Sequence, residues 1–347
     1  MKYFLSDYSL GAHPKVLQAL IDTNMEHTDG YALDEFSEEC REMLRKMIGK
    51  PNANVHFLVG GTPTNTITIS AALRPYEGVI SPRTGHIYVH ETGSVEANGH
   101  RVFAAPTEDG KLTPEAIEQM MVLYEDEHTV IPKMAYITHP TENGGVYTKA
   151  EVEALRKCCD KNGLYLYMDG ARLGTALAWP GNDLELEDIA DLCDAFYMGG
   201  TKVGALYGEA LFIMNEEINK DFRFMIKRSG ALLAKGRTIA VQLKALFEDE
   251  TGNYDIKKSL YYGLAKHENE MAIKIAEGVQ KLGYKLWLPH QTNQVFVIVP
   301  NEKIEELNKE FMFYTWTPYD ETSSVIRLVA NWNTLDSELD DLFEAMK

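Results

Sequence analysis

The sequence predicts an α/β fold in which a mostly parallel sheet is flanked by helices and is followed by a smaller C-terminal α+β domain. Short apolar runs alternate with helix-like segments through the middle of the chain. Strands and helices that alternate at this spacing are typical of right-handed crossovers between parallel strands. After about residue 215 the pattern changes to long charged helices with two later strands, which favours a separate small domain.

Each element of the large domain follows from its periodicity and its end signals. A run such as "LYLYMDG" is short and apolar, whereas "KAEVEALRKCCDKNG" spaces its apolar residues at helical intervals and ends on Gly163. The same criteria place strands at residues 54–59, 134–140, 164–170 and 195–200, and helices at 64–73, 149–162 and 184–193.

The C-terminal region is predicted to contain a helix at residues 267–283 and strands at 294–300 and 324–331. The stretch 247–255 is polar and rich in turn-forming residues, which fits a linker. We therefore divide the chain into a large domain that takes in the N-terminal segment, residues 1–250, and a small domain, residues 251–347.

Composition limits the partners of the protein. The net charge is -18 over 347 residues, whereas nucleic acids and anionic membranes require a basic surface, so we expect a small molecule as the partner instead. No run reaches the roughly 18 apolar residues of a membrane span, and the N-terminus has no apolar leader run, which predicts a cytoplasmic protein. No metal is predicted, because the spacing of the cysteines does not suit zinc and favours packed thiols at Cys40, Cys158, Cys159 and Cys193.

Polar residues follow predicted strands at the carboxyl edge of the sheet, where open α/β folds bind ligands. Gly60, Gly61 and Thr62 open a helix whose positive end could hold a phosphate, although a plain tight turn explains them equally well. Asp169 ends another strand and Arg172 lies three positions on, so a structural salt bridge is the alternative to a functional role for that pair.

Lys202 follows the next strand, in "AFYMGGTKVGALYG". A lysine held by glycines at the end of a buried strand is partly desolvated, which depresses its pKa and makes the amine available as a nucleophile. A phosphate cradle, a carboxylate and an amine in one crevice are what pyridoxal 5'-phosphate requires. The alternative is an interaction protein in which Asp169, Arg172 and Lys202 form a buried ion network.

The order of "FLVGGTPTN", "GHIYVHETG", "YMDGARLGTA", "GGTKVGALYG" and "VIRLV" resembles the threonine aldolase and β-eliminating lyase family. This family consists of fold-type I enzymes that depend on pyridoxal phosphate, and the resemblance covers most of the chain. It implies that Lys202 is the Schiff-base lysine, that Asp169 pairs with the pyridine nitrogen, and that Gly61 and Thr62 form the phosphate loop.

The resemblance also implies residues on the substrate side. His86 matches a histidine that stacks on the cofactor ring near the substrate hydroxyl, with Glu91 beside it; on local grounds, a lone histidine at the start of the apolar run "HIYV", read as a strand, is more often structural. Ser6, Arg172 and Arg327 match groups that receive the substrate carboxylate, and Arg172 is also expected beside the cofactor. Arg327 lies in an apolar strand, so its guanidinium needs an anion in any case.

Other candidates have weaker local support. His128 matches a second substrate-side histidine of the family, although helix capping or plain surface exposure explains it equally well. His139 and Glu142 lie at a strand end as candidate lining of the crevice. In the basic run 220–237, Lys235 or Arg237 is expected to reach a phosphate, often across a subunit boundary, and a solvated helix face is the alternative.

The resemblance implies a lyase of amino acid metabolism that cleaves a β-hydroxy-α-amino acid, such as threonine or allo-threonine, to glycine and an aldehyde by a retro-aldol reaction. The alternatives are β-elimination, transamination or racemisation with the same cofactor, or a protein that binds pyridoxal phosphate without turnover. The resemblance further implies a homodimer or homotetramer with active sites shared between subunits.

Overall fold

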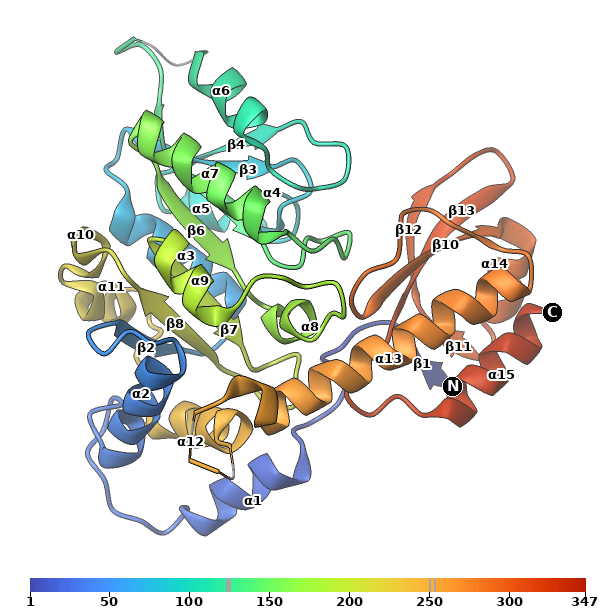
Figure 1. The fold of residues 1–347 in the computed structure, drawn as a ribbon, viewed down its shortest axis with the longest axis horizontal. Helices are drawn as coiled ribbons and strands as arrows, with labels where there is room; N and C mark the ends of the chain where they lie inside the picture. Colours follow the sequence, from blue (N-terminus) through green and yellow to red (C-terminus); the bar gives the residue numbers. More distant parts are fainter. Residues whose placement is uncertain (123–125, 250, 253) are drawn as a thin grey trace.

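A seven-stranded sheet forms the centre of the larger part of the computed structural model, which describes residues 1–122, 126–249, 251–252 and 254–347 (Figure 1). The order across the sheet is β2-β8-β7-β6-β5-β3-β4. All neighbours from β7 to β4 pair in parallel, and β8 runs antiparallel to β2 and β7, which confirms the mostly parallel sheet. The strands are β2 (Asn54–Leu58), β3 (Glu77–Pro82), β4 (Arg101–Ala105), β5 (Ile131–Thr138), β6 (Tyr165–Asp169), β7 (Ala195–Gly199) and β8 (Glu209–Ile213).

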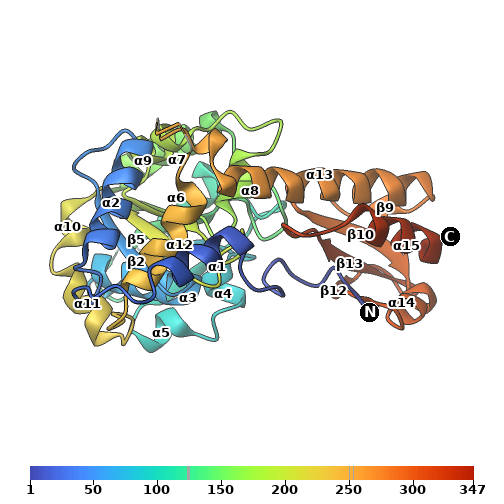
Figure 2. The same ribbon diagram turned by 90° about the horizontal axis from the view of Figure 1, so that it is seen from below.

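Helices cover both faces of this sheet (Figure 2), because alternate strand residues point to opposite sides. Ala135 and Ile137 belong to the core on one face, whereas Met134 and Tyr136 belong to the core on the other. The first core is covered by α1 (Pro14–Asp22), α2 (Glu35–Met47), α6 (Pro114–Val122), α7 (Lys149–Asn162), α8 (Leu173–Leu177), α9 (Leu186–Leu192) and α12 (Arg237–Phe247). The second is covered by α3 (Gly61–Ala72), α4 (His86–Val89), α5 (Ser94–Ala97), α10 (Glu216–Asn219) and α11 (Phe222–Arg228).

Helix α7 illustrates how the sequence sets an element and its ends. Thr148 and Glu151 form a capping box at its start, and Gly163 ends it with φ 65°, a left-handed conformation that favours glycine. Between these ends Val152 and Cys159 lie on its buried side. The helix predicted at 149–162 is thereby confirmed, and all four cysteines are buried free thiols.

The C-terminal region forms a second layer structure that is separate from the central sheet in Figures 1 and 2. Its antiparallel sheet has the order β12-β13-β10-β9, and three helices pack their apolar residues against one face. The elements are η1 (Ile256–Lys258), α13 (Leu260–Lys281), β9 (Lys285–Leu286), β10 (Gln294–Pro300), α14 (Asn301–Leu307), β12 (Tyr314–Pro318), β13 (Ser323–Val329) and α15 (Asp336–Met346).

The N-terminus packs with this C-terminal region. Strand β1 (Lys2–Tyr3) pairs in parallel with β11 (Phe311–Met312), and Phe4 belongs to the C-terminal core. The N–H of Val329 donates to the carbonyl of Phe4 at 2.9 Å. The division of the chain at residue 250 stays a prediction, and positions 250 and 253 of the expected linker lie outside the described residues.

One local prediction is wrong. Residues His86–Val89 form the short helix α4 and not the start of a strand, although Ile, Tyr and Val favour strands. The strand in this part of the chain is β3, which precedes His86 and lies between β5 and β4 in the sheet. The sequence reasoning missed β3 because "EGVISP" contains both glycine and proline. In the described part of the chain, no helix is long and apolar enough to cross a membrane.

Candidate active site

A cavity of about 430 Å³ lies where the central sheet meets the N-terminal segment and the C-terminal sheet. It brings together Lys202, Arg172, Arg327 and His86, which come from four separate parts of the sequence. Its lining consists of Leu5, Tyr8, His86, His90, Glu142, Arg172, Lys202, Tyr314, Trp316 and Arg327.

Asp169 ends β6 as a buried carboxylate with four hydrogen-bond donors. Its Oδ1 accepts from the Tyr197 hydroxyl at 2.5 Å and from the N–H of Ala171 at 3.0 Å, and its Oδ2 accepts from the Tyr136 hydroxyl at 2.6 Å and from Asn65 Nδ2 at 2.8 Å. Burial alone raises the pKa of a carboxyl, but the charge of His86 and these donors outweigh it and hold the pKa of Asp169 below its ordinary value. Asp169 is therefore ionised.

Lys202 lies in the turn that follows β7. Glycines allow that turn to pack tightly, because an added Cβ would lie 2.4 Å from the carbonyl oxygen of Ala171 at Gly199 and 2.7 Å from Leu243 at Gly200. Burial, followed by the nearby Arg172 guanidinium, lowers the pKa of Lys202. Lys202 therefore loses its proton more readily than a surface lysine, and its neutral amine is more readily formed.

His86 forms a hydrogen-bonded pair with Glu91. The His86 Nδ1 lies 2.8 Å from Glu91 Oε1, and Ser94 Oγ donates to the other oxygen of Glu91 at 2.8 Å. Because an ionised carboxylate only accepts, Nδ1 is the donor and Nε2 is left for the cavity. Burial lowers the pKa of His86, but the hydrogen bond to Glu91 and the charges of Glu142 and Asp169 raise it above its ordinary value.

Arg172 and Asp7 form a buried ion pair. The Arg172 Nε donates to Asp7 Oδ2 at 2.5 Å and its Nη2 donates to Oδ1 at 3.1 Å, while Asn293 Nδ2 donates to Asp7 Oδ2 at 2.9 Å. Burial raises the pKa of Asp7, but Arg172 and Lys202 bring it down to about 2. The Nε/Nη2 edge of the guanidinium is therefore already occupied, and Asp7 is a site residue that the sequence reasoning passed over although it follows Ser6.

Arg327 has weak hydrogen bonds and, within the described chain, no ion pair. Its Nη1 lies 3.3 Å from Gln294 Oε1, its Nη2 lies 3.4 Å from the carbonyl of Leu5, and its buried Nε has no partner. Its guanidinium carbon lies 5.2 Å from the centre of the Trp316 ring. Burial and then the charge of Arg172 lower the pKa of Arg327. Such a group fits an anion that arrives with a ligand.

Gly61 and Thr62 form the first turn of α3, next to Asp169. The first helical hydrogen bond runs from the N–H of Thr64 to the carbonyl of Gly60, so the amides of Gly61 and Thr62 precede the helical ladder. A Cβ at Gly61 would lie 2.9 Å from the Tyr197 hydroxyl, one of the donors to Asp169. This helix end therefore lies directly beside the buried carboxylate.

The remaining sequence candidates lie outside the cavity lining. Ser6 is buried and its hydroxyl is 2.7 Å from that of Ser9, beside the lining residue Leu5. His139 is buried with no partner for Nε2, and burial lowers its pKa to about 3. His128 and Lys235 are exposed, and Arg237 donates to the carbonyl of Thr23 at 2.8 Å. Within a single chain, these residues do not meet Lys202.

Some site residues carried no signal that separates them from core residues. Tyr136 and Tyr197 lie in apolar strands, where a tyrosine is an ordinary core residue, and Asn65 is one of several polar residues in the helix predicted at 64–73. His90 and Trp316 also line the cavity. His90 stands four positions after His86 within a motif that the resemblance used, which was a usable signal.

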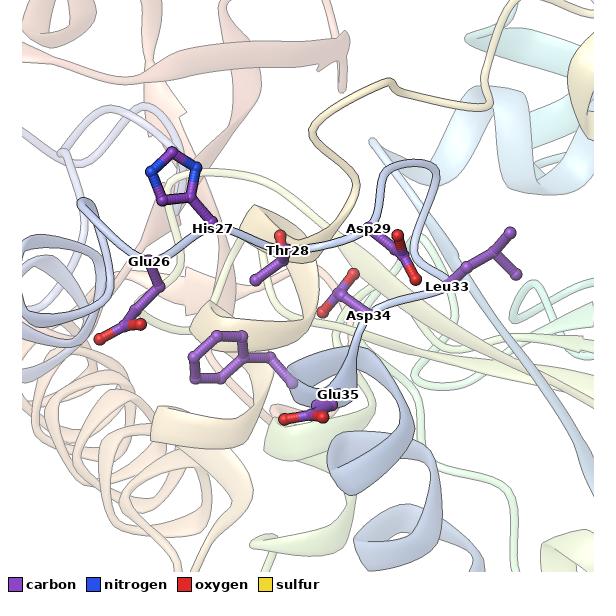
Figure 3. Close-up of a pocket in the computed structure, with 8 residues that line it drawn as sticks. Glu26, His27, Thr28, Asp29, Leu33, Asp34 and Glu35 are labelled. Carbon is purple, nitrogen blue, oxygen red and sulfur yellow. The ribbon is translucent and has the colours of Figure 1, made fainter.

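A larger cavity of about 520 Å³ lies elsewhere, and its lining combines four acidic side chains with His27, Thr28, Leu33 and Phe36 (Figure 3). Asp34 in this cavity has a structural role, since it caps α2 by accepting from the N–H and the hydroxyl of Ser37 at 2.9 and 2.8 Å. Across the described ranges, no group of three or more His, Cys, Asp or Glu side chains is arranged to hold a metal ion. None of the predicted site residues lines this cavity.

The fold is that of the fold-type I enzymes. A single mutant of aspartate aminotransferase from Thermus thermophilus aligns over 99% of this chain and 90% of its own with a TM-score of 0.72 at 16% identity, a likeness of fold alone. A threonine aldolase from Leishmania major aligns over 100% of this chain and 98% of its own, with a TM-score of 0.95 at 42% identity.

The chain belongs to the beta-eliminating lyase family, whose model matches residues 4–302. A low specificity L-threonine aldolase from Pseudomonas sp. is 31% identical over 344 residues, which is 98% of this chain and 95% of the relative. A relative of the same name from Saccharomyces cerevisiae is 27% identical over 274 residues, which is 77% of this chain and 66% of the relative. The protein is a lyase by this membership.

Proposed function

We propose that the protein is a pyridoxal phosphate-dependent lyase that cleaves the Cα–Cβ bond of a threonine-like β-hydroxy-α-amino acid to give glycine and an aldehyde. The observation that carries this proposal is that one cavity is lined by Lys202, His86 and Arg327, and that Arg327 has no ion pair among the described residues. These groups supply an amine for the cofactor, a proton acceptor and a carboxylate receptor. The relatives named threonine aldolase, which extend over nearly the whole chain, support the choice of substrate class.

The residues present fit pyridoxal phosphate. Asp169 is ionised and suits a protonated ring nitrogen, Lys202 offers an amine of lowered pKa, and the amides of Gly61 and Thr62 precede the helical ladder of α3 and suit a phosphate. When bound, the cofactor supplies an electron sink for the electron pair of the broken bond. Lys235, exposed in one chain, is our candidate for a phosphate contact made across a subunit boundary.

The chain's own side chains then have distinct tasks. Arg327 binds the substrate carboxylate through charge-assisted hydrogen bonds, and Arg172, held by Asp7, adds positive charge beside it. The Nε2 of His86 accepts the proton of the β-hydroxyl, the Cα–Cβ bond breaks, and the aldehyde leaves. Glu91 keeps the other imidazole proton on Nδ1, so that Nε2 faces the hydroxyl as an acceptor. A proton delivered to Cα completes glycine.

We also propose a homo-oligomer in the cytoplasm. Three large apolar side chains, Met25, Leu33 and Phe224, are 85%, 64% and 75% exposed, which supports burial against a second copy of the chain. Ser6 and His128 remain proposed substrate-binding residues: Ser6 lies beside the cavity, and His128 would have to act from the partner subunit.

The experiment is a spectrum of the purified protein with added pyridoxal phosphate, recorded before and after glycine or L-threonine, with acetaldehyde assayed in the same cuvette. A visible band that is absent in Lys202→Ala, together with acetaldehyde from threonine, supports the proposal. A band with 2-oxobutyrate from threonine in place of acetaldehyde identifies β-elimination, and a band with 3-hydroxy-2-oxobutyrate identifies transamination. A band with no product from any amino acid identifies a binding protein without turnover, and no band at all refutes the cofactor.

A further inference from the structure

Asn65 lies between the two halves of the site and is completely buried on α3. Its Nδ2 donates to Asp169 Oδ2 at 2.8 Å and to Glu91 Oε1 at 2.8 Å. Its Oδ1 accepts from the Tyr167 hydroxyl at 2.9 Å. One amide group therefore bridges the carboxylate that serves the cofactor side and the carboxylate that serves His86.

The orientation of this amide is determined by its partners. If the amide were flipped, its oxygen would face two carboxylate oxygens, and its NH₂ group would face the tyrosine hydroxyl, so two acceptor–acceptor contacts would replace two hydrogen bonds. Both hydrogens of Nδ2 are thus engaged with acidic groups. Nothing else in the described chain donates to both Asp169 and Glu91.

The bridge extends to His86, because Glu91 Oε1 accepts from His86 Nδ1 at 2.8 Å as well as from Asn65. Two buried carboxylates that share one donor lie only a few ångströms apart. Like charges at such range repel one another, and a shared donor between them offsets part of that repulsion and fixes their positions.

We propose that Asn65 is a positioning residue that holds the Glu91 carboxylate in place against His86 and thereby couples the His86–Glu91 pair to Asp169. This inference rests on the proposed function for its catalytic meaning, since His86 is the proposed proton acceptor. The hydrogen bonds on which it rests lie within the chain and do not require the cofactor.

The test is a titration of His86 in the cofactor-free protein, followed by NMR of ¹³C-labelled histidine and assigned by the signal lost in His86→Asn. In Asn65→Leu, Glu91 Oε1 loses one of its two hydrogen-bond donors and is no longer held against Nδ1, so the pKa of His86 falls by on the order of one unit. The other charged groups that act on His86, namely Glu142, Asp169, Lys202 and His90, are the same in both proteins.

Three further variants make the result decisive. Ser70→Ala is the matched control, because Ser70 is on the same helix and its hydroxyl has no partner. Asn65→Ser keeps one donor, so it shows a smaller fall and replaces the leucine variant if that variant fails to fold. In a Glu91→Gln background, Asn65→Leu leaves the His86 titration nearly unchanged.

An unchanged or raised pKa of His86 in both Asn65 variants overturns the proposal, as does an equal shift when Glu91 is already glutamine. Because no substrate or cofactor is present, a failure of the lyase assay does not affect this result.

Discussion

Arg172 holds Asp7 by both carboxylate oxygens, from Nε at 2.5 Å and from Nη2 at 3.1 Å, in a buried position between the N-terminal segment and the large sheet. Arg327 lies on the same cavity and has no such partner among the described residues. Replacing Arg172 should therefore change the stability of the protein, whereas replacing Arg327 should change ligand binding.

Arg172→Leu is expected to lower the free energy of unfolding by about 3–5 kcal/mol, because it leaves Asp7 buried without its ion-pair partner. Arg327→Leu is expected to leave the free energy of unfolding unchanged or to raise it, since it leaves no carboxylate of the described residues unpaired. Urea unfolding of the cofactor-free proteins measures both values. Equal destabilisation by the two substitutions contradicts the assignment of Arg327 to a ligand.

The same Arg327→Leu variant is expected to lose roughly 10- to 100-fold in kcat/KM for threonine, because a charge-assisted hydrogen bond contributes about 1.5–3 kcal/mol. Most of the loss should fall on KM, and retention of pyridoxal phosphate should not change. Steady-state kinetics with cofactor in excess checks this, with Lys220→Ala as an exposed-charge control. Loss of cofactor instead of substrate affinity would mean that Arg327 acts elsewhere.

Asp7 makes the free energy of unfolding depend on pH in the acidic range. Its pKa is about 2 in the folded chain against an ordinary 3.8, so the stabilisation is fully present above about pH 4 and is lost as the pH falls toward 2. The shift corresponds to about 2 kcal/mol. In Asp7→Asn, this part of the pH dependence disappears from urea-unfolding curves taken between pH 5 and pH 2. The exposed variant Glu305→Gln should retain it.

Lys202→Ala is expected to keep its fold and lose covalent attachment of pyridoxal phosphate. Burial disfavours the charged form of this lysine, so removing it costs the folded state little. Borohydride reduction followed by mass spectrometry should find the cofactor on the wild-type chain alone, while the thermal midpoints stay within a few degrees. A large drop in the midpoint would instead identify a structural ion network.

Glu91→Gln should lower the pKa of His86, because the hydrogen bond to Glu91 is among the interactions that raise it. A proton acceptor is active only when neutral, so log kcat/KM rises with pH through this pKa. The rising limb should move to lower pH by on the order of one unit and reach a lower plateau. The pH profile measured with threonine checks this; a limb that moves to higher pH refutes the role given to Glu91.

The parts of the fold that have local causes could be predicted from the sequence. The strands before Asp169 and Lys202 are apolar runs that end on glycine, and parallel strands bring their carboxyl ends to one edge, so the two residues could be placed together. The helix α4 could not be predicted from the sequence, because tertiary packing overrides the strand preference of Ile87 and Val89.

Contacts between distant segments were also out of reach. Asp7 and Arg172 are 165 positions apart, and no spacing or periodicity links them. Asn65 stands 104 positions from Asp169, and its amide could equally have faced solvent. The depth at which a polar residue is buried is a property of the assembled layers, which no short stretch of sequence encodes.

The pairing of β1 with β11 has a consequence for the order in which the molecule matures on the ribosome. Lys2 and Tyr3 are translated before the large sheet, whereas their partners Phe311 and Met312 are translated after it. The segment that follows β1 carries Leu5 and Tyr8 to the cavity. The nascent chain can fold its large sheet early, but this wall of the cavity is completed only after Phe311 and Met312 have been translated.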